Sequence, residues 1–379
     1  MASHRSVLAL SWPLLLCSGA HAETDAKPNL PPTTYNYYVS PTGSDAGPGS
    51  KEQPFQTLAR AALAATQPST TVWVAPGKYA GGIKTTANGS ASGRIYWVST
   101  GKWRAKIVPP AHSTTDSAWD NRGNYVSIIG FDVSGKQPGT GTLWRHGIYT
   151  GGSYSVIEGN HVHHLATTIP CTSAGGSAIG VDSYYRGVKG DVIGNRVHDV
   201  GPAGCRYVQG IYMSTSGTVK NNIVFRIGQA AIHLWHDAKD LQIINNTVSA
   251  SVFGIIVGGG DFYHDDSGAN NVHVHNNIVF DNTYGISEQG KTGTANTYRN
   301  NLVYQNDIYD WSLRNGLQHD DTVSADPLFV SYPATKPDFH LRTGSQAIGR
   351  GLATYAPPTD FDGKPRNQTT GYDIGAYQH

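Results

Sequence analysis

Charged side chains are scarce in this chain, at 15% of 379 residues, and hydrophobic residues make up only 38%. This composition excludes a coiled coil or a helical bundle, since both need Ala, Leu, Glu and Lys in quantity. Lys and Arg number 28 against 27 Asp and Glu, so no basic field indicates nucleic acid as a partner. Beyond the N-terminal segment the chain has no long apolar run, and we expect no membrane span.

Glycine and aromatic residues are abundant instead. The chain contains 45 Gly, 8 Trp, 21 Tyr and 9 Phe. The aromatic side chains supply enough apolar surface for a large core, which argues against disorder. Together with the many glycines and asparagines, they favour numerous short strands joined by turns.

The first 22 residues are typical of a signal peptide. His4 and Arg5 form a short basic start, an apolar run covers residues 7–17, and Ala20-His-Ala22 fits a small-x-small cleavage site. We therefore expect cleavage after Ala22, a poorly ordered leader over residues 23–34, and a secreted or periplasmic protein that acts as a monomer.

Two cysteines remain after that cleavage, Cys171 and Cys205. Export to an oxidising compartment favours a disulfide between them. The alternative is two unrelated buried thiols. A bridge requires Cα atoms within about 7 Å.

A repeat runs through the middle of the chain. Each unit begins with a small residue and isoleucine and ends in Asn-x-Val, and the units recur at roughly 24 to 35 residues. The small-Ile pairs are 147–148, 178–179, 210–211, 231–232, 254–255 and 285–286, and the asparagines are Asn160, Asn195, Asn222, Asn246, Asn277 and Asn301.

Self-similarity at this period predicts a solenoid. The units show strand-like alternation and no helical period, so each unit is interpreted as one coil of short strands. We expect the repeated asparagines to stack in an internal ladder, because side-chain amides bond readily to the backbone of neighbouring rungs. One domain is predicted, with coils from about Tyr37 to Ile308.

Segments at both ends resemble the pectate-lyase-like superfamily of right-handed parallel β-helix proteins. Residues 37–45 with Pro54-Phe-Gln-Thr-Leu58 resemble the opening of secreted, chondroitinase-B-like polysaccharide lyases. Residues 72–79 look like a first coil, and Asp326-Pro-Leu-Phe329 and Asp373-Ile-Gly-Ala-Tyr377 resemble the terminal segment of such proteins.

The resemblance implies an all-β fold, a single-stranded right-handed parallel β-helix with terminal caps. The β-helix domain would cover residues 35–379, with an N-terminal cap at 35–75 that includes a short helix over Thr57–Ala65, and a C-terminal cap at 322–379. The fold also carries hydrolases, epimerases and adhesins, so it does not by itself identify a reaction.

Alternation along each strand places the residue after the repeat isoleucine on the outer surface. The resulting column contains Tyr149, Gly180, Tyr212, His233, Ile256 and Ser287. Polar and aromatic residues concentrate on its second to fourth rungs, which predicts a substrate groove there. The expected substrate-binding residues are Arg186, Trp235, His236, Asp237, Lys239 and Tyr149.

A lyase that acts on a uronic-acid polymer needs a cation for the sugar carboxylate, a base and an acid. We expect Tyr212 and His233 to carry the proton chemistry and Arg206 to bind the carboxylate, with Asp182 orienting the histidine or a sugar hydroxyl. Arg186 and Lys239 are alternative cations. The predicted function is β-elimination on an acidic polysaccharide. The alternatives are a glycoside hydrolase that uses Asp182 and Asp237 and a non-catalytic sugar-binding protein.

The remaining histidines and acidic residues are expected to have structural roles. His161, His163, His164 and His198 lie next to the asparagine turns and have no catalytic zinc spacing, so they are expected at turns or on the surface. No metal ligand is assigned. Calcium is the candidate cofactor, and the acidic stretch His264-Asp-Asp266 offers oxygen ligands for it. The resemblance also leaves open a lyase mechanism in which a metal ion neutralises the carboxylate, although the chain lacks a run of calcium-binding aspartates on one rung.

Overall fold

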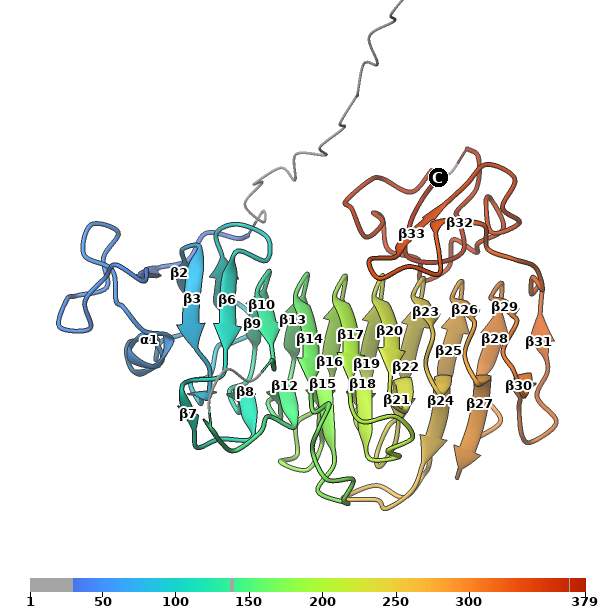
Figure 1. Cartoon of the computed structure of the whole chain (residues 1–379), viewed down its shortest axis with the longest axis horizontal. Coiled ribbons are helices and arrows are strands. Elements are labelled where there is room, and N and C mark those ends of the chain that lie inside the picture. Colours follow the sequence, from blue (N-terminus) through green and yellow to red (C-terminus); the bar gives the residue numbers. More distant parts are fainter. Residues whose placement is uncertain (1–29, 137–139, 368) are drawn as a thin grey trace, which may run out of the picture.

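The computed structural model describes residues 30–136, 140–367 and 369–379. The predicted signal peptide lies outside these residues. The described chain winds into a parallel β-helix whose three sheets run along its length (Figure 1). The all-β prediction is therefore confirmed. No helix among the described residues is long and apolar enough to cross a membrane.

Sheet one contains eleven parallel strands, and its first strands belong to the predicted N-terminal cap. They are β1 (Tyr35–Val39), β2 (Thr70–Val74), β5 (Ile95–Ser99), β9 (Val126–Ile129), β13 (Ser155–Glu158), β16 (Gly190–Ile193), β19 (Gly217–Lys220), β22 (Leu241–Ile244), β25 (Val272–His275), β28 (Thr297–Arg299) and β31 (His319–Asp320).

Sheet two contains nine strands. They are β3 (Gly77–Ala80), β6 (Ala105–Val108), β10 (Asp132–Ser134), β14 (His161–Leu165), β17 (Arg196–Val200), β20 (Ile223–Ile227), β23 (Thr247–Ser249), β26 (Ile278–Phe280) and β29 (Leu302–Tyr304).

Sheet three also contains nine strands. They are β4 (Ile83–Thr85), β8 (Ser117–Asn121), β12 (His146–Thr150), β15 (Gly176–Val181), β18 (Val208–Met213), β21 (Ala230–Leu234), β24 (Phe253–Gly259), β27 (Tyr284–Gly290) and β30 (Tyr309–Ser312). Small two-stranded sheets pair β7 (His112–Ser113) with β11 (Thr140–Gly141) and β32 (Phe329–Ser331) with β33 (Asp338–Leu341).

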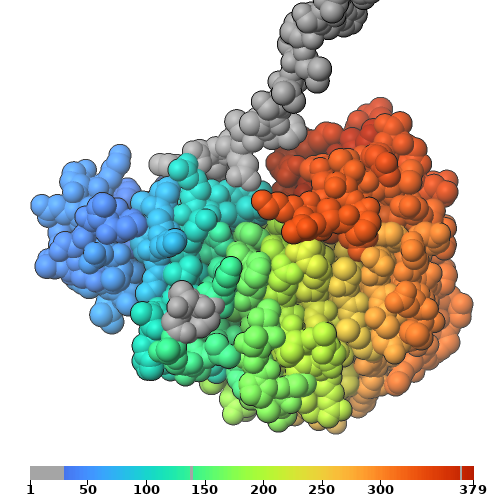
Figure 2. Space-filling model, viewed as in Figure 1, coloured from blue at the N-terminus to red at the C-terminus, as the bar shows by residue number. Residues whose placement is uncertain are grey.

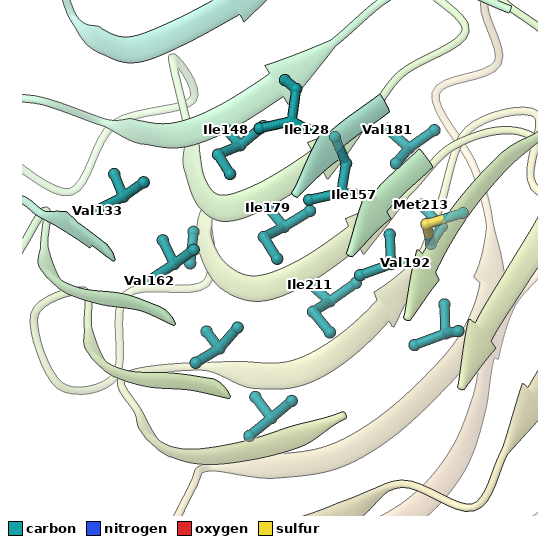
Figure 3. Packing of buried hydrophobic residues seen from close by; sticks show 14 of the residues in the cluster. Ile128, Val133, Ile148, Ile157, Val162, Ile179, Val181, Val192, Ile211 and Met213 are labelled. Atoms are coloured by element: carbon teal, nitrogen blue, oxygen red, sulfur yellow. The ribbon is translucent and has the colours of Figure 1, made fainter. Parts of the chain in front are cut away.

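The interior is a column of aliphatic side chains contributed by all three sheets (Figure 3). In one coil Ile148, Ile157 and Val162 meet at the centre, and each is at most 1% exposed. Ile179, Val192 and Val197 repeat the arrangement one coil later. Because each coil stacks its few aliphatic side chains on those of the next coil, the chain forms a continuous core although only 38% of its residues are hydrophobic.

The asparagine ladder is present as predicted. Asn195 donates from its side-chain amide to the Asn222 Oδ1 atom at 3.0 Å, and Asn222 donates in the same way to Asn246 at 3.0 Å. The ladder continues from Asn160 to Asn301, and all six asparagines are fully buried. In the coil before Asn160, the Phe131 backbone N–H donates to the Asn160 Oδ1 atom. An apolar residue therefore precedes the first asparagine of the ladder.

The predicted helix is α1 (Leu58–Ala64), whose N-cap Thr57 accepts a hydrogen bond from the Arg60 backbone N–H. Leu58 and Ala61 are its buried face and close the first end of the core.

Residues 322–379 differ from the expected end cap, because they lie along the side of the solenoid (Figures 1 and 2). Phe329 and Phe339 pack over outward-facing side chains of sheet two, including Ile223, Phe225 and Ile278. These side chains would otherwise expose an apolar patch to water, so the segment covers them.

Candidate functional site

The outer face of sheet three carries the predicted column of residues. Tyr149 pairs with Gly180, Gly180 with Tyr212, and Tyr212 with His233 in consecutive parallel strands. Gly180 leaves the space between the two tyrosines open, because a Cβ atom there would come within 3.3 Å of the Tyr149 ring. The expected register of this column is thus confirmed.

A groove of about 890 Å³ follows this face. Its lining contains most of the predicted site residues together with others that the pattern did not indicate. The lining includes Asp116, Asp120, Arg122, His146, Tyr149, Asp182, Tyr185, Arg206, Gln209, Tyr212, His233, Trp235, His236, Asp261 and Tyr263.

Tyr212 and His233 meet edge to face at the floor of the groove, with ring centroids 5.3 Å apart. Burial raises the pKa of Tyr212 well above its ordinary value, with Tyr263 and Asp182 adding to the effect. Burial, and then His236, lower the pKa of His233 to about 3. At neutral pH the tyrosine therefore keeps its proton and the histidine is neutral.

The Nδ1 atom of His233 is buried and has no hydrogen-bond partner among the described residues. Asp182 does not orient this ring, contrary to one expectation. Its carboxylate accepts hydrogen bonds from Tyr149 Oη at 2.7 Å and Ser214 Oγ at 2.8 Å, as well as from the Tyr184 backbone N–H. Asp182 thereby fixes the Tyr149 hydroxyl at the groove wall.

Arg206 reaches the groove from the loop before β18. Its guanidinium lies 4.8 Å from the Tyr207 ring centroid and donates to the Tyr207 hydroxyl at 2.7 Å. No carboxylate of the described chain lies within ion-pairing distance of it. This cation is consequently available to a ligand that carries negative charge.

The predicted disulfide joins Cys171 to Cys205, with Cα atoms 5.5 Å apart. It connects the loop after β14 to the loop that carries Arg206. Ser173, Ala174 and Gly175 of the first loop also line the groove. The bridge therefore holds two loops at one wall of the site.

Replacing Cys205 by Ser is expected to raise KM for a groove substrate several-fold with a smaller change in kcat, because Arg206 loses its anchored loop while the strand residues stay in register. Steady-state kinetics with and without reductant would measure this. A Cys171→Ser variant with unchanged KM would contradict the link between bridge and groove.

Trp235 and His236 line the groove beside His233. The Trp235 indole donates to Asp261 Oδ2 at 3.2 Å, and the His236 ring stacks on Tyr263 with centroids 3.9 Å apart. Both Asp261 and Tyr263 belong to the loop between β24 and β25. This loop thus forms the wall opposite the Cys205 loop.

Three predicted residues lie outside this groove. The Asp237 carboxylate accepts hydrogen bonds from the Ser183 hydroxyl and from the Tyr263 and His264 backbone N–H groups. Although burial opposes it, these bonds hold the pKa of Asp237 below its ordinary value. Asp237 anchors the loop and does not line the groove.

Lys239 forms an ion pair with Asp265, and Arg186 lines a smaller neighbouring cleft of about 460 Å³. The three cations expected near the substrate, Arg186, Arg206 and Lys239, therefore lie in different places, because each belongs to a different loop. Arg206 alone of the three faces the main groove.

Sequence reasoning missed Arg122, His146 and Tyr185. The Arg122 guanidinium lies 3.6 Å from the Tyr185 ring centroid and pairs with Asp120 at 2.6 Å. Asp120 pairs with Tyr149 in register and extends the outward column by one rung. The pattern hid this rung because Trp119 occupies the place of the repeat isoleucine.

His146 was missed because both residues of the small-Ile pair point inward. A Cβ atom on Gly147 would meet Val162 at 2.6 Å, and the equivalent Ala178 is fully buried. The residue before the pair therefore faces outward, which adds His146 and Gln209 to the groove. Burial lowers the pKa of His146.

The acidic stretch considered for calcium is engaged with basic groups. The Asp265 carboxylate pairs with Lys239, and the Asp266 carbonyl accepts a hydrogen bond from Lys291 Nζ. No cluster of three metal-ligating side chains occurs there in the part of the chain that the structure describes. The loop is instead tied to its neighbours by these contacts.

Comparison with known proteins identifies the architecture. A family described as "right handed beta helix region" matches residues 112–248, and a family of unknown function, DUF1565, matches residues 41–86. The uncharacterized protein YwoF of Bacillus subtilis (strain 168) is 26% identical over 306 residues, which are 71% of this chain. The matched region spans 62% of the length of YwoF.

Solved structures share the fold at low identity. Pectate lyase Pel9A superposes with a TM-score of 0.62 at 16% identity, covering 92% of this chain and 97% of that one. A structure described as a glycoside hydrolase gives 0.56 at 9% identity, covering 77% and 95%. A rhamnogalacturonan lyase gives 0.51 at 15%, covering 84% and 97%. These likenesses show the fold, a right-handed parallel β-helix.

Proposed function

We propose that this pectate-lyase-like β-helix is an enzyme that cleaves a uronic-acid-containing polysaccharide by β-elimination in the groove of sheet three. The observation that carries the proposal is the Tyr212–His233 pair, in which burial leaves a protonated phenol beside a neutral imidazole. At neutral pH the phenol therefore has a proton to donate and the imidazole a lone pair to accept one, and their contact on adjacent rungs brings both within reach of one substrate.

In the proposed reaction Arg206 binds the sugar carboxylate, which makes the adjacent C–H more acidic. The neutral His233 ring accepts that proton, and the electron pair of the C–H bond forms a carbon–carbon double bond. The glycosidic C–O bond on the neighbouring carbon breaks, and the Tyr212 hydroxyl protonates the departing oxygen. Chain cleavage therefore consumes no water and leaves one unsaturated sugar end.

A glycoside hydrolase is the second candidate, since four aspartates line the groove: Asp116, Asp120, Asp182 and Asp261. Hydrolysis needs two carboxyl groups free to act on the substrate. Asp182 already accepts three hydrogen bonds, and Asp120 pairs with Arg122. The pair first considered for hydrolysis, Asp182 with Asp237, is disfavoured because the Asp237 carboxylate binds the loop.

A panel of acidic and neutral polysaccharides separates the candidates. A lyase generates ultraviolet-absorbing unsaturated ends, a hydrolase generates reducing ends without that absorbance, and a sugar-binding protein generates neither. We expect ultraviolet absorbance to rise with at least one uronic-acid polymer. Reducing ends alone would exclude elimination.

Arg206→Gln is expected to raise KM for the cleaved polymer at least about tenfold, because a charge-assisted contact to the carboxylate is lost. Arg186→Gln is the matched control, since Arg186 lines the neighbouring cleft, and it should change KM much less. Equal effects of the two substitutions would contradict the specific role of Arg206.

A further inference from the structure

Four histidines gather on sheet two, away from the groove of sheet three. His161, His163 and His164 belong to β14, and His198 belongs to the adjacent strand β17. The sequence alone placed them at turns or on the surface. In the structure one ring nitrogen from each of His161, His163 and His198 lies within 4.8 Å of the other two.

The contact between His161 and His198 joins two nitrogens. Their Nε2 atoms are 2.8 Å apart, and His198 Nδ1 lies 2.6 Å from Asp199 Oδ2. A neutral imidazole carries one proton. The Asp199 carboxylate accepts a hydrogen bond from His198 Nδ1, so the proton of His198 is on Nδ1 and its Nε2 atom carries a lone pair. The Nε2 lone pair of His198 is thus directed at the His161 ring. A histidine whose other nitrogen donates to a carboxylate is the usual arrangement of a metal ligand.

His163 is also held by a carboxylate, and its other nitrogen faces His164. Its Nε2 atom lies 2.8 Å from Asp132 Oδ1, and its Nδ1 atom lies 2.6 Å from the Nδ1 atom of His164. Two carboxylates, Asp132 and Asp199, therefore flank the three rings and offset the charge of a bound cation.

The surrounding residues hold the cluster in place. Arg226 donates twice to the Asp199 carboxylate, at 2.7 and 2.8 Å. Trp103 packs on the His161 ring with centroids 4.9 Å apart, and Phe225 stacks on His198 at 4.8 Å. The side chains of His161, His163 and His198 are only 19%, 15% and 12% exposed. Such restraint limits rotation of the rings while leaving an entry path from solvent.

We propose that His161, His163 and His198 bind one divalent transition-metal ion of the kind that imidazole prefers, such as Zn²⁺, Ni²⁺ or Cu²⁺. Metal–nitrogen distances of about 2.0–2.1 Å place tetrahedral ligand atoms roughly 3.3 Å apart. The three nitrogens lie within 4.8 Å of one another and the rings are stacked, so binding requires the rings to turn toward a common centre. His164 lies in a second group with His198 and Asp199 and is the nearest candidate for a fourth ligand.

The ion would connect β14 to β17 next to the C-terminal segment. Arg196, which begins β17, donates to the Pro337 carbonyl at 3.2 Å, and Phe225 packs on Phe339 at 5.2 Å. The role is structural, because the site lies on sheet two while the proposed chemistry takes place on sheet three.

Calorimetric titration of the full chain, purified without a histidine tag and treated with EDTA, tests the proposal with Zn²⁺ and Ni²⁺ alone. We expect one equivalent to bind and the melting temperature to rise. His198→Ala should abolish both effects. Asp199→Asn keeps all three rings, should weaken binding about 10- to 100-fold, and serves as the test if His198→Ala does not fold.

His273→Ala is the matched control, since His273 lies on β25 of sheet one. It should bind metal as the parent chain does. Substituting Co²⁺ should give visible absorption bands that disappear in His198→Ala. Absence of saturable uptake by the parent chain, or equal uptake by the His198 and His273 variants, would overturn the proposal.

Discussion

Tyr212→Phe and His233→Ala are each expected to lower turnover on a cleaved uronic-acid polymer at least about a hundredfold, the usual scale for loss of an acid or base group. Both residues sit on consecutive rungs with their side chains in contact at the floor of the groove. The phenylalanine variant removes one oxygen atom and leaves the ring packing unchanged, so a loss of turnover would report chemistry and not folding.

The pH dependence provides a second measure of the same pair. A free histidine would lose activity as pH falls through about 6.5, whereas His233 has its pKa lowered to about 3 and stays neutral well below that. The Tyr212 pKa is raised, so its proton is retained at alkaline pH. We therefore expect kcat/KM to stay level from roughly pH 4 to 9.

Tyr284→Phe and His273→Ala serve as controls, because neither residue lines the groove. Both should retain near-parental turnover. Near-parental turnover in the Tyr212 and His233 variants as well would eliminate this pair and direct attention to His236 and His146, which line the same groove.

Asn222→Ala is expected to lower the free energy of unfolding by roughly 2–6 kcal/mol, since two buried backbone groups lose their partners at about 1–3 kcal/mol each. The Asn222 side chain donates to the Val192 carbonyl at 2.9 Å, and its Oδ1 atom accepts the Asn195 backbone N–H at 2.9 Å. Val192 and Asn195 are both fully buried.

Urea unfolding followed by circular dichroism would measure this change. Asn36→Ala is the comparison, because Asn36 is exposed on β1 and its amide accepts a hydrogen bond from the Trp73 indole at the surface; it should cost no more than about 1 kcal/mol. A loss below about 1 kcal/mol for Asn222→Ala would show that the ladder amide adds little to stability.

Position along the strands followed from the sequence. The repeated asparagines predicted the ladder. The repeat isoleucines predicted that the side chains of Tyr149, Tyr212 and His233 share one face of the solenoid. A strand alternates between two faces, and stacked coils repeat that alternation at a fixed spacing. Local pattern is therefore sufficient to specify the rung and the face of most strand residues.

Loops and lateral packing were decided only by the tertiary structure. Asp237 and Lys239 immediately follow a strand of the groove yet bind the loop at 261–267, and Arg122 enters the site from the end of β8. His163 and His198 each stand three residues after a ladder asparagine, so the repeat aligns them on neighbouring rungs, whereas Trp103, which packs on His161, comes from a loop outside the repeat. Such contacts depend on loop lengths and on neighbours brought by the winding of the chain, and no periodic pattern within one coil encodes them.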